Sequence, residues 1–243
     1  MNSKQQVSRN EPNEIGELIT WPRRYNLLTD LIFLGRAGAV RRRFADASGA
    51  GPGDSVLDIG SGPGRLAREL ARRVGPQGRV LGIDPSPPML AYAAEDAPPN
   101  CRFEAGAAQE LTQPDASFDV VTSTFVMHHI PEAERKNALA GMFRVLRPGG
   151  RLLLVDANPN TGVHGAVLRI LGKLLRHRHD HDHNAHGHNH HAHGHDHHAH
   201  GQDPLAEVDV RQYRATLTEI GFTDLEFSPE RYSIGILTAV KPR

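Results

Sequence analysis

Short apolar runs alternate with amphipathic stretches through the middle of the chain. In chain order the apolar runs are SVLDIG at 55–60, RVLGID at 79–84, CRFEAG at 101–106, FDVVTSTFV at 118–126 and GRLLLVDA at 150–157. Their length and composition are typical of buried strands. Amphipathic segments such as GRLARELARRV and EAERKNALAGMFRVL separate them. Strands alternating with helices predict parallel pairing through right-handed crossovers, and therefore an open α/β sheet with helices on both faces.

Other patterns flank this core. Residues 25–47 carry leucines at helical spacing among arginines and predict one or two amphipathic helices. Residues 210–243 predict a helix followed by two strands. Arg147–Gly150, with the sequence RPGG, is expected to end a helix immediately before the last core strand.

The domain organisation follows from these boundaries. We expect a doubly wound, mostly parallel α/β sheet made of residues 23–160 and 203–243, with residues 1–22 disordered. Residues 161–202 are expected to form a basic, apolar helix and then a flexible, His-rich insertion ahead of the last helix and strands. The helix either covers the substrate pocket or makes a weak contact with a membrane surface.

Composition limits the partners and the compartment. The 28 basic and 28 acidic residues give a net charge of +0, which offers no reason to expect a nucleic-acid partner. Cys101 is the single cysteine, so an intramolecular disulfide framework is excluded. The first residues are polar, and no stretch approaches the roughly 20 apolar residues of a membrane span. We expect a cytoplasmic protein.

Residues 177–200 hold thirteen of the sixteen histidines, together with three aspartates. Nothing in this tract can bury a core, so a flexible loop is expected. Imidazole and carboxylate are ligands for zinc, nickel, cobalt and copper. The tract is interpreted as a metal store or sensor, as a solvated insertion without an evolved ligand, or as a catalytic metal site. The candidate ligands are His179, His181, His183, His186, His188, His190, His191, His193 and His195.

The segment DIGSGPG, residues 58–64, follows the first strand and opens a helix. Glycines let the backbone turn sharply there, and free N–H groups at the helix start favour polar or anionic ligand groups. Asp84 ends the next strand, where a carboxylate can bind both hydroxyls of a ribose. Loop and acid together predict a nucleoside ligand. The third glycine of a dinucleotide fingerprint comes one residue early, at Gly64, and Arg65 takes its place, which weakens a nicotinamide interpretation.

Four segments together resemble the class I S-adenosylmethionine-dependent methyltransferases, namely VLDIGSGPG, GIDPSPPML, SFDVVTSTFVMHHI and RVLRPGGRLLLVD. The segment YNLLTDLIFLG and the GF…KP ending are similar to the ubiquinone/menaquinone biosynthesis C-methyltransferase-like branch. The resemblance implies a Rossmann-like fold, S-adenosylmethionine as cofactor, and a small-molecule acceptor of hydrophobic or quinone-like character. Two alternatives stay open: a metal-binding or metal-sensing protein that uses a nucleoside-binding fold without turnover, and an NAD-dependent oxidoreductase.

The resemblance also implies roles for single residues. Asp58, Gly60 and Gly62 would surround the methionine part of the cofactor, and Asp84 would hold its ribose. Ala107 stands where many relatives have an aspartate that binds the adenine amino group, so backbone groups there would have to replace it. The full set expected around the cofactor is Asp58, Gly60, Ser61, Gly62, Gly64, Asp84, Pro85, Met89, Ala107, Ala108 and Thr124.

Three residues are candidates for catalysis. His128 and His129 follow the fourth core strand, and Asp156 ends the fifth, so all three are expected at the carboxyl edge where open α/β sheets bind ligands. A carbon or oxygen nucleophile needs a proton removed, which a histidine can do. Alternatively, the histidines pack or cap the helix after Pro131 and Asp156 caps a loop. Tyr25 is interpreted as a helix-packing residue, with a lid over the cofactor as the alternative.

Overall fold

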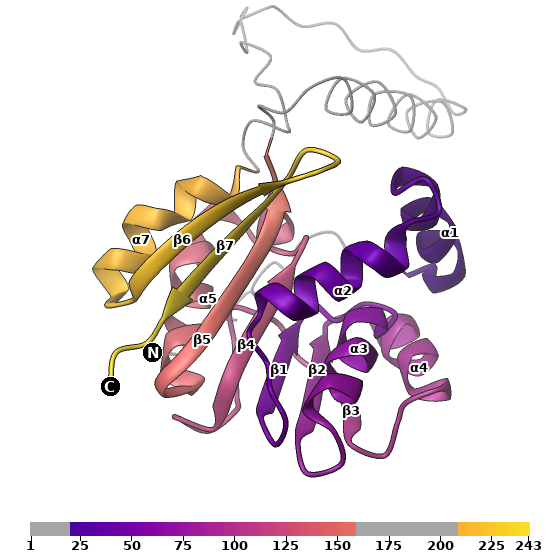
Figure 1. Ribbon diagram of the computed structural model, residues 1–243, viewed down its shortest axis with the longest axis horizontal. Helices are drawn as coiled ribbons and strands as arrows, with labels where there is room; N and C mark the ends of the chain where they lie inside the picture. The colour runs from indigo at the N-terminus through magenta and orange to yellow at the C-terminus, as the bar shows by residue number, and fades with distance from the viewer. Residues whose placement is uncertain (1–19, 159–208) are drawn as a thin grey trace, which may run out of the picture.

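A seven-stranded mixed sheet lies at the centre of the computed structural model, which describes residues 20–158 and 209–243 (Figure 1). Its strands lie in the order β3-β2-β1-β4-β5-β7-β6. Their bounds are β1 Ser55–Ile59, β2 Arg79–Asp84, β3 Cys101–Ala105, β4 Phe118–Thr124, β5 Leu146–Ala157, β6 Thr223–Glu230 and β7 Ile234–Val240.

The predicted parallel core is confirmed. Strands β1 to β5 pair in parallel, and all five residues of β1 are buried because helices cover the sheet on both sides. The C-terminal helix and two strands are also found, with β7 antiparallel to both β5 and β6. The sequence pattern did not indicate that β7, the last strand in the chain, inserts between β5 and β6.

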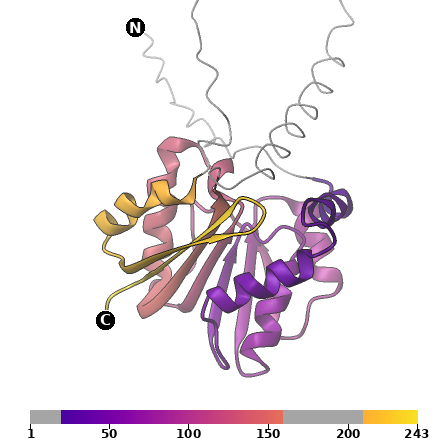
Figure 2. The same cartoon turned by 45° about the horizontal axis from the view of Figure 1, so that its top comes forward.

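Helices form a layer on each face of the sheet, with α2 and α3 on one side and α5 and α7 on the other (Figures 1 and 2). The side chains of β5 alternate between the layers: Leu153 and Val155 contact the α2/α3 layer, while Leu152 and Leu154 contact the α5/α7 layer. The helices are α1 Pro22–Ile32, α2 Ala37–Ala47, α3 Arg65–Val74, α4 Pro87–Glu95, α5 Glu132–Val145 and α7 Tyr213–Ile220, with 3₁₀ turns η1 Met127–His129 and η3 Val210–Gln212.

Helix α3 shows how the pattern forms the core. Its apolar residues recur at helical spacing and are all buried, while its arginines lie outside that stripe. Full burial of one leucine side chain such as Leu70 is worth about 1.5–3 kcal/mol. The helix follows Gly64 and ends at Gly75, and both glycines have the positive φ that suits a glycine at a helix boundary.

The junction between α5 and β5 differs from the prediction. Residues 147–150 do not separate helix from strand, because β5 begins directly after α5, where Leu146 pairs with Phe118. The register of β4 and β5 then shifts, and Gly149 takes a φ of +82° within this bulge. The Gly149 N–H donates a 2.8 Å hydrogen bond to the Lys241 carbonyl, so the segment after β7 holds the bulge.

The expected N-terminal helices are α1 and α2. Helix α1 buries Asn26 and leaves the side chains of Leu27 and Leu31 exposed, with Leu34 exposed in the turn that follows. Within residues 20–158 and 209–243, no helix is long and apolar enough to cross a membrane. The predictions for the first residues, for the helix and possible membrane contact at 161–176 and for the histidine tract lie outside the described residues.

Candidate cofactor and catalytic site

The glycine loop lies at the carboxyl edge of the sheet, between β1 and α3. Strand order reverses between β1 and β4, and ligands of open α/β sheets bind at such a switch point. A Cβ atom on Gly60 would lie 2.2 Å from a methyl carbon of Val126, so only glycine fits there. Gly62 also has a positive φ, but its Cβ would meet nothing within 4 Å. The loop is therefore packed tightly on one side and open above Gly62.

Asp84 connects the end of β2 to this loop. One carboxylate oxygen accepts a 2.8 Å hydrogen bond from the Gly62 N–H, and the other accepts a 2.9 Å bond from the Ser86 N–H. Burial raises the pKa of Asp84, and these two hydrogen bonds oppose that rise. Asp84 thus holds the backbone of the glycine loop, a role that the sequence analysis did not include, and each oxygen keeps a lone pair for a ligand hydroxyl.

Asp58 lies deeper than expected. Its side chain is 1% exposed between β1 and β4, and one oxygen accepts a 2.7 Å hydrogen bond from the Thr122 hydroxyl. The other oxygen is buried without a partner among the described residues. Burial raises the pKa of Asp58 to about 7 and the charge of Asp84 adds to the rise, while the Thr122 hydrogen bond and a weaker backbone contact from the Ala67 N–H oppose it.

The remaining residues expected around the cofactor also end or follow strands at this edge. Thr124 ends β4 and is half-buried, as are Pro85 after β2 and Ala107 after β3. Met89 is 2% exposed and Ala108 lies in the core, so these two side chains have little surface for a ligand. Sequence reasoning found the right edge of the sheet but could not separate these two buried side chains from the more accessible ones.

Helix α1 lies close to the loop and is fastened to it. The Arg65 guanidinium donates two hydrogen bonds to the Asp30 carboxylate, at 2.8 and 3.2 Å. This ion pair holds the pKa of Asp30 below its usual value. Burial, and next the charge of Asp84, raise the pKa of Tyr25, so Tyr25 lies near the predicted ribose ligand. Arg65, which stands where a dinucleotide-binding motif has its third glycine, therefore joins α1 to α3. No pattern in the sequence pointed to Asp30 as its partner.

His128 and Asp156 form a hydrogen-bonded pair. His128 lies in η1 after β4, and its Nδ1 is 2.9 Å from an Asp156 carboxylate oxygen that also accepts from the Ala157 N–H. The Asp156 side chain is 1% exposed and that of His128 is 31% exposed. A buried carboxylate bonded to Nδ1 favours the tautomer with the proton on that nitrogen and leaves Nε2 as the acceptor. The structure thus joins two residues that the sequence analysis proposed separately.

His129 lies beside this pair, with its ring centroid 4.1 Å from that of His128. Helix α5 begins after Pro131, which makes no side-chain cap hydrogen bond, and the packing or capping alternative for the two histidines stays a prediction. Within the described parts of the chain, no group of three or more His, Cys, Asp or Glu side chains is arranged to hold a metal ion. The nine histidines proposed as metal ligands lie outside those parts.

Comparison with known proteins shows which family the chain resembles. The sequence model of a methyltransferase domain family matches residues 56–150, which include the glycine loop and Asp84. Residues 56–150 thus match a methyltransferase domain, and the chain is similar to class I S-adenosylmethionine-dependent methyltransferases. This similarity argues against the nicotinamide alternative. The metal-binding alternative depends on the histidine tract and stays a prediction.

Two curated methyltransferases illustrate the similarity. The ubiquinone/menaquinone biosynthesis C-methyltransferase UbiE of Vibrio campbellii is 37% identical over 138 residues, which are 55% of this chain and 52% of that protein. The demethylmenaquinone methyltransferase of Deinococcus radiodurans is 41% identical over 151 residues, covering 60% of this chain and 61% of that protein. The chain spans between about half and three fifths of the length of these relatives. A methyltransferase structure from Aquifex aeolicus shares the fold, with a TM-score of 0.63, 18% identity and coverage of 90% of this chain and 98% of that one.

The residues of the methyltransferase domain fit S-adenosylmethionine. The buried oxygen atoms that lack a hydrogen-bond partner among the described residues include the amide oxygen of Asn26, the second carboxylate oxygen of Asp58 and the hydroxyl of Ser61. Such atoms destabilise the fold unless a donor reaches them. An ammonium group and ribose hydroxyls are donors of this kind, and the space above Gly62 is open to receive them.

Proposed function

We propose that the chain transfers a methyl group from S-adenosylmethionine to a small, hydrophobic, quinone-like acceptor. When bound, this cofactor supplies the methyl group as an activated sulfonium. The observation that carries the proposal is the pair of His128 and Asp156 at the same sheet edge as the glycine loop. A base at this position suits an acceptor that must lose a proton, such as the hydroxyl or ring carbon of a quinol.

The residues of the chain align and activate the acceptor. Nε2 of His128 takes the proton from the acceptor, and the electron pair left on the acceptor atom would displace the sulfur of a bound S-adenosylmethionine at its methyl carbon. Asp156 accepts the hydrogen bond from Nδ1–H and stabilises the imidazolium. Asp156 is therefore a positioning residue. His129 stays a second candidate for proton transfer because its ring lies next to that of His128.

The acceptor class is supported by the relatives. Both curated proteins are named for the methylation of quinone precursors. The exposed leucines of α1 offer apolar surface on the helix that is fastened to the cofactor loop, which suits an apolar acceptor.

The direct test is a methyl-transfer assay with the full chain. A 1,4-naphthoquinol with a short prenyl chain, kept reduced under nitrogen, is incubated with S-adenosylmethionine carrying a labelled methyl group, and mass spectrometry follows the label. We expect label in the quinol. His128→Ala should lower kcat by about 100-fold or more, since general bases contribute 10²–10⁴-fold. Added imidazole should restore part of that rate, which would not occur if His128 were only structural.

Calorimetric titration with S-adenosylmethionine separates binding from chemistry. Asp84→Ala should abolish binding because it removes the ribose ligand and frees Gly62, whereas His128→Ala should keep the affinity of the native chain. His129→Ala is the matched variant for the neighbouring ring. Absence of label in naphthoquinols and simple phenols alike, with cofactor binding intact, would contradict the acceptor class. Absence of cofactor binding by the native chain would contradict the activity itself.

A further inference from the structure

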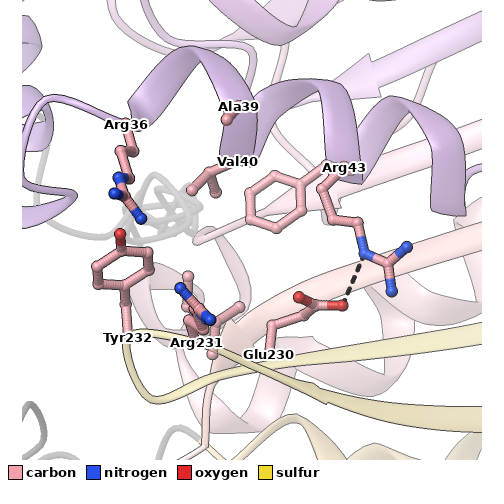
Figure 3. A pocket seen from close by; sticks show the side chains of 9 residues that line it. Arg36, Ala39, Val40, Arg43, Glu230, Arg231 and Tyr232 are labelled. Atoms are coloured by element: carbon pink, nitrogen blue, oxygen red, sulfur yellow. Dashed lines mark hydrogen bonds and ion pairs between the residues drawn. The ribbon is translucent and has the colours of Figure 1, made fainter.

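A second hollow opens between α2 and the hairpin that joins β6 to β7 (Figure 3). It measures about 210 Å³. Its charged residues are three arginines, Arg36 and Arg43 from α2 and Arg231 from the hairpin, and one acid, Glu230. The hollow therefore carries an excess of positive charge in a chain whose net charge is +0.

Only one of these arginines is neutralised. Arg43 pairs with Glu230 at 2.9 Å, the interaction drawn as a dashed line in Figure 3. Across residues 20–158 and 209–243, neither the Arg36 nor the Arg231 guanidinium forms a hydrogen bond or an ion pair. Figure 3 shows the side chains of Arg36 and Tyr232 directed toward one another across the hollow. Arg36 and Arg231 therefore bring to the hollow two guanidinium groups whose N–H donors have no ion-pair partner among the described residues.

The rest of the lining is apolar. Val40, Phe44 and Ile234 form the floor, and Ala39 lies on the exposed side of α2. Phe44 and Ile234 are buried, so the floor belongs to the core and is fixed in shape. An apolar floor beneath unpaired guanidinium groups matches a molecule with an apolar body and an anionic head.

The hollow is separate from the site of methyl transfer. Its floor residues Phe44 and Ile234 share one core cluster with Val155, on the α2/α3 face of the sheet. Asp156 follows Val155 in β5 and therefore points to the opposite face, where its charge also acts on Tyr213 of α7. The ring of Phe33 contacts that of Tyr232, and the ring of Phe125 contacts that of Phe44, but neither Phe33 nor Phe125 lines the hollow.

We propose that this hollow is a second ligand site, which binds an amphiphilic oxyanion: a phosphate or carboxylate group attached to a short apolar chain or ring. Arg36 and Arg231 bind the oxyanion, because guanidinium groups match the planar geometry of carboxylate and phosphate oxygens. The apolar body lies against Val40, Phe44 and Ile234. The Arg43–Glu230 pair limits the far end of the site.

The test is calorimetric titration of the full chain with hexyl phosphate at pH 8, where the imidazoles of the histidine tract are neutral and do not attract the probe. Hexanoate, inorganic phosphate and hexanol are titrated in parallel. We expect hexyl phosphate and hexanoate to bind, and inorganic phosphate and hexanol to bind at least about tenfold more weakly, because each contacts only half of the site.

Variants locate the probe. Arg36→Gln and Arg231→Gln should each weaken hexyl phosphate binding by roughly fivefold, as expected for a partly exposed charge pair, and together by about 20-fold. Arg42→Gln is the control, since Arg42 is an exposed arginine of the same helix that does not line the hollow. Ala39→Glu should also weaken binding, because it adds a carboxylate to the lining.

The outcomes decide the proposal in either direction. Loss confined to Arg36→Gln, Arg231→Gln and Ala39→Glu, with unchanged affinity for S-adenosylhomocysteine, supports a separate amphiphile site. Equal affinity of hexyl phosphate for the native chain and the double arginine variant overturns it, as does an equal loss in Arg42→Gln. Inorganic phosphate that binds as tightly as hexyl phosphate overturns the role of the apolar floor. Loss of S-adenosylhomocysteine binding in the same variants overturns the separation from the cofactor site.

Discussion

Replacement of Asp58 by asparagine should change how stability depends on pH. Burial raises the pKa of this carboxyl from 3.8 to about 7 in the folded chain. The folded state therefore holds the proton more tightly than the unfolded state, and the free energy of unfolding falls as the pH rises from about 4 to about 7. At about 1.4 kcal/mol for each pH unit in this interval, the charged carboxylate lowers the free energy of unfolding by about 4 kcal/mol above pH 7. Asparagine keeps an acceptor for Thr122 and has no charge to bury.

The assay is urea unfolding of the native chain and Asp58→Asn at intervals from pH 4 to pH 8. The difference in free energy of unfolding between the two proteins removes the titration of every group that does not interact with Asp58. The free energy of unfolding of the variant minus that of the native chain should increase by about 4 kcal/mol from pH 4 to pH 8. Asp96→Asn, the same substitution at an exposed position, is measured alongside as the control. A constant difference for Asp58→Asn, or one that favours the native chain as the pH rises, would refute the assignment of a buried, proton-binding carboxyl.

Two further predictions concern contacts that the sequence did not indicate. Asp30→Asn breaks the ion pair with Arg65 and should speed dissociation of S-adenosylmethionine by about two- to fivefold. The effect is small because an ion pair whose side chains are 28% and 42% exposed is worth about 1 kcal/mol or less. Stopped-flow measurements at low and high salt should show that only the dissociation rate of the native chain depends on salt. Tyr213→Phe removes a hydroxyl that is buried without a partner among the described residues. The substitution should raise the free energy of unfolding, measured by urea titration, by up to about 1 kcal/mol. A loss of stability would mean that this hydroxyl has a hydrogen-bond partner.

The layered fold could be predicted because burial on both faces leaves a direct mark on the sequence. Strands β1 and β2 read as nearly continuous apolar runs, and α3 shows the apolar spacing of a helix against a sheet. The direction of β7 leaves no such mark. Its residues, IGILTAV, are equally suited to a parallel or an antiparallel neighbour, so only the tertiary structure decides that it runs against β5.

The candidate site could be predicted in its location but not in its contacts. Residues at the ends of parallel strands meet at one edge, which was sufficient to propose both His128 and Asp156. Their hydrogen bond depends on the register of β4 and β5, and a bulge shifts that register. The pair of Arg65 and Asp30 was missed for a related reason, since ion pairs between distant segments follow no periodicity.

The place of β7 has a consequence for how the chain folds as it is synthesised. Because β7 pairs with β5 across the whole stretch that includes the histidine tract, the far edge of the nascent sheet cannot close until that tract has left the ribosome. Until then β5 is an open edge strand with Leu152, Leu153 and Leu154 incompletely covered, and such edges recruit other unfinished chains. The segment between β5 and β7, which includes the histidine tract, sets the length of this delay. Shortening it should reduce the entropy lost when the two strands meet and so favour completion of the sheet over aggregation.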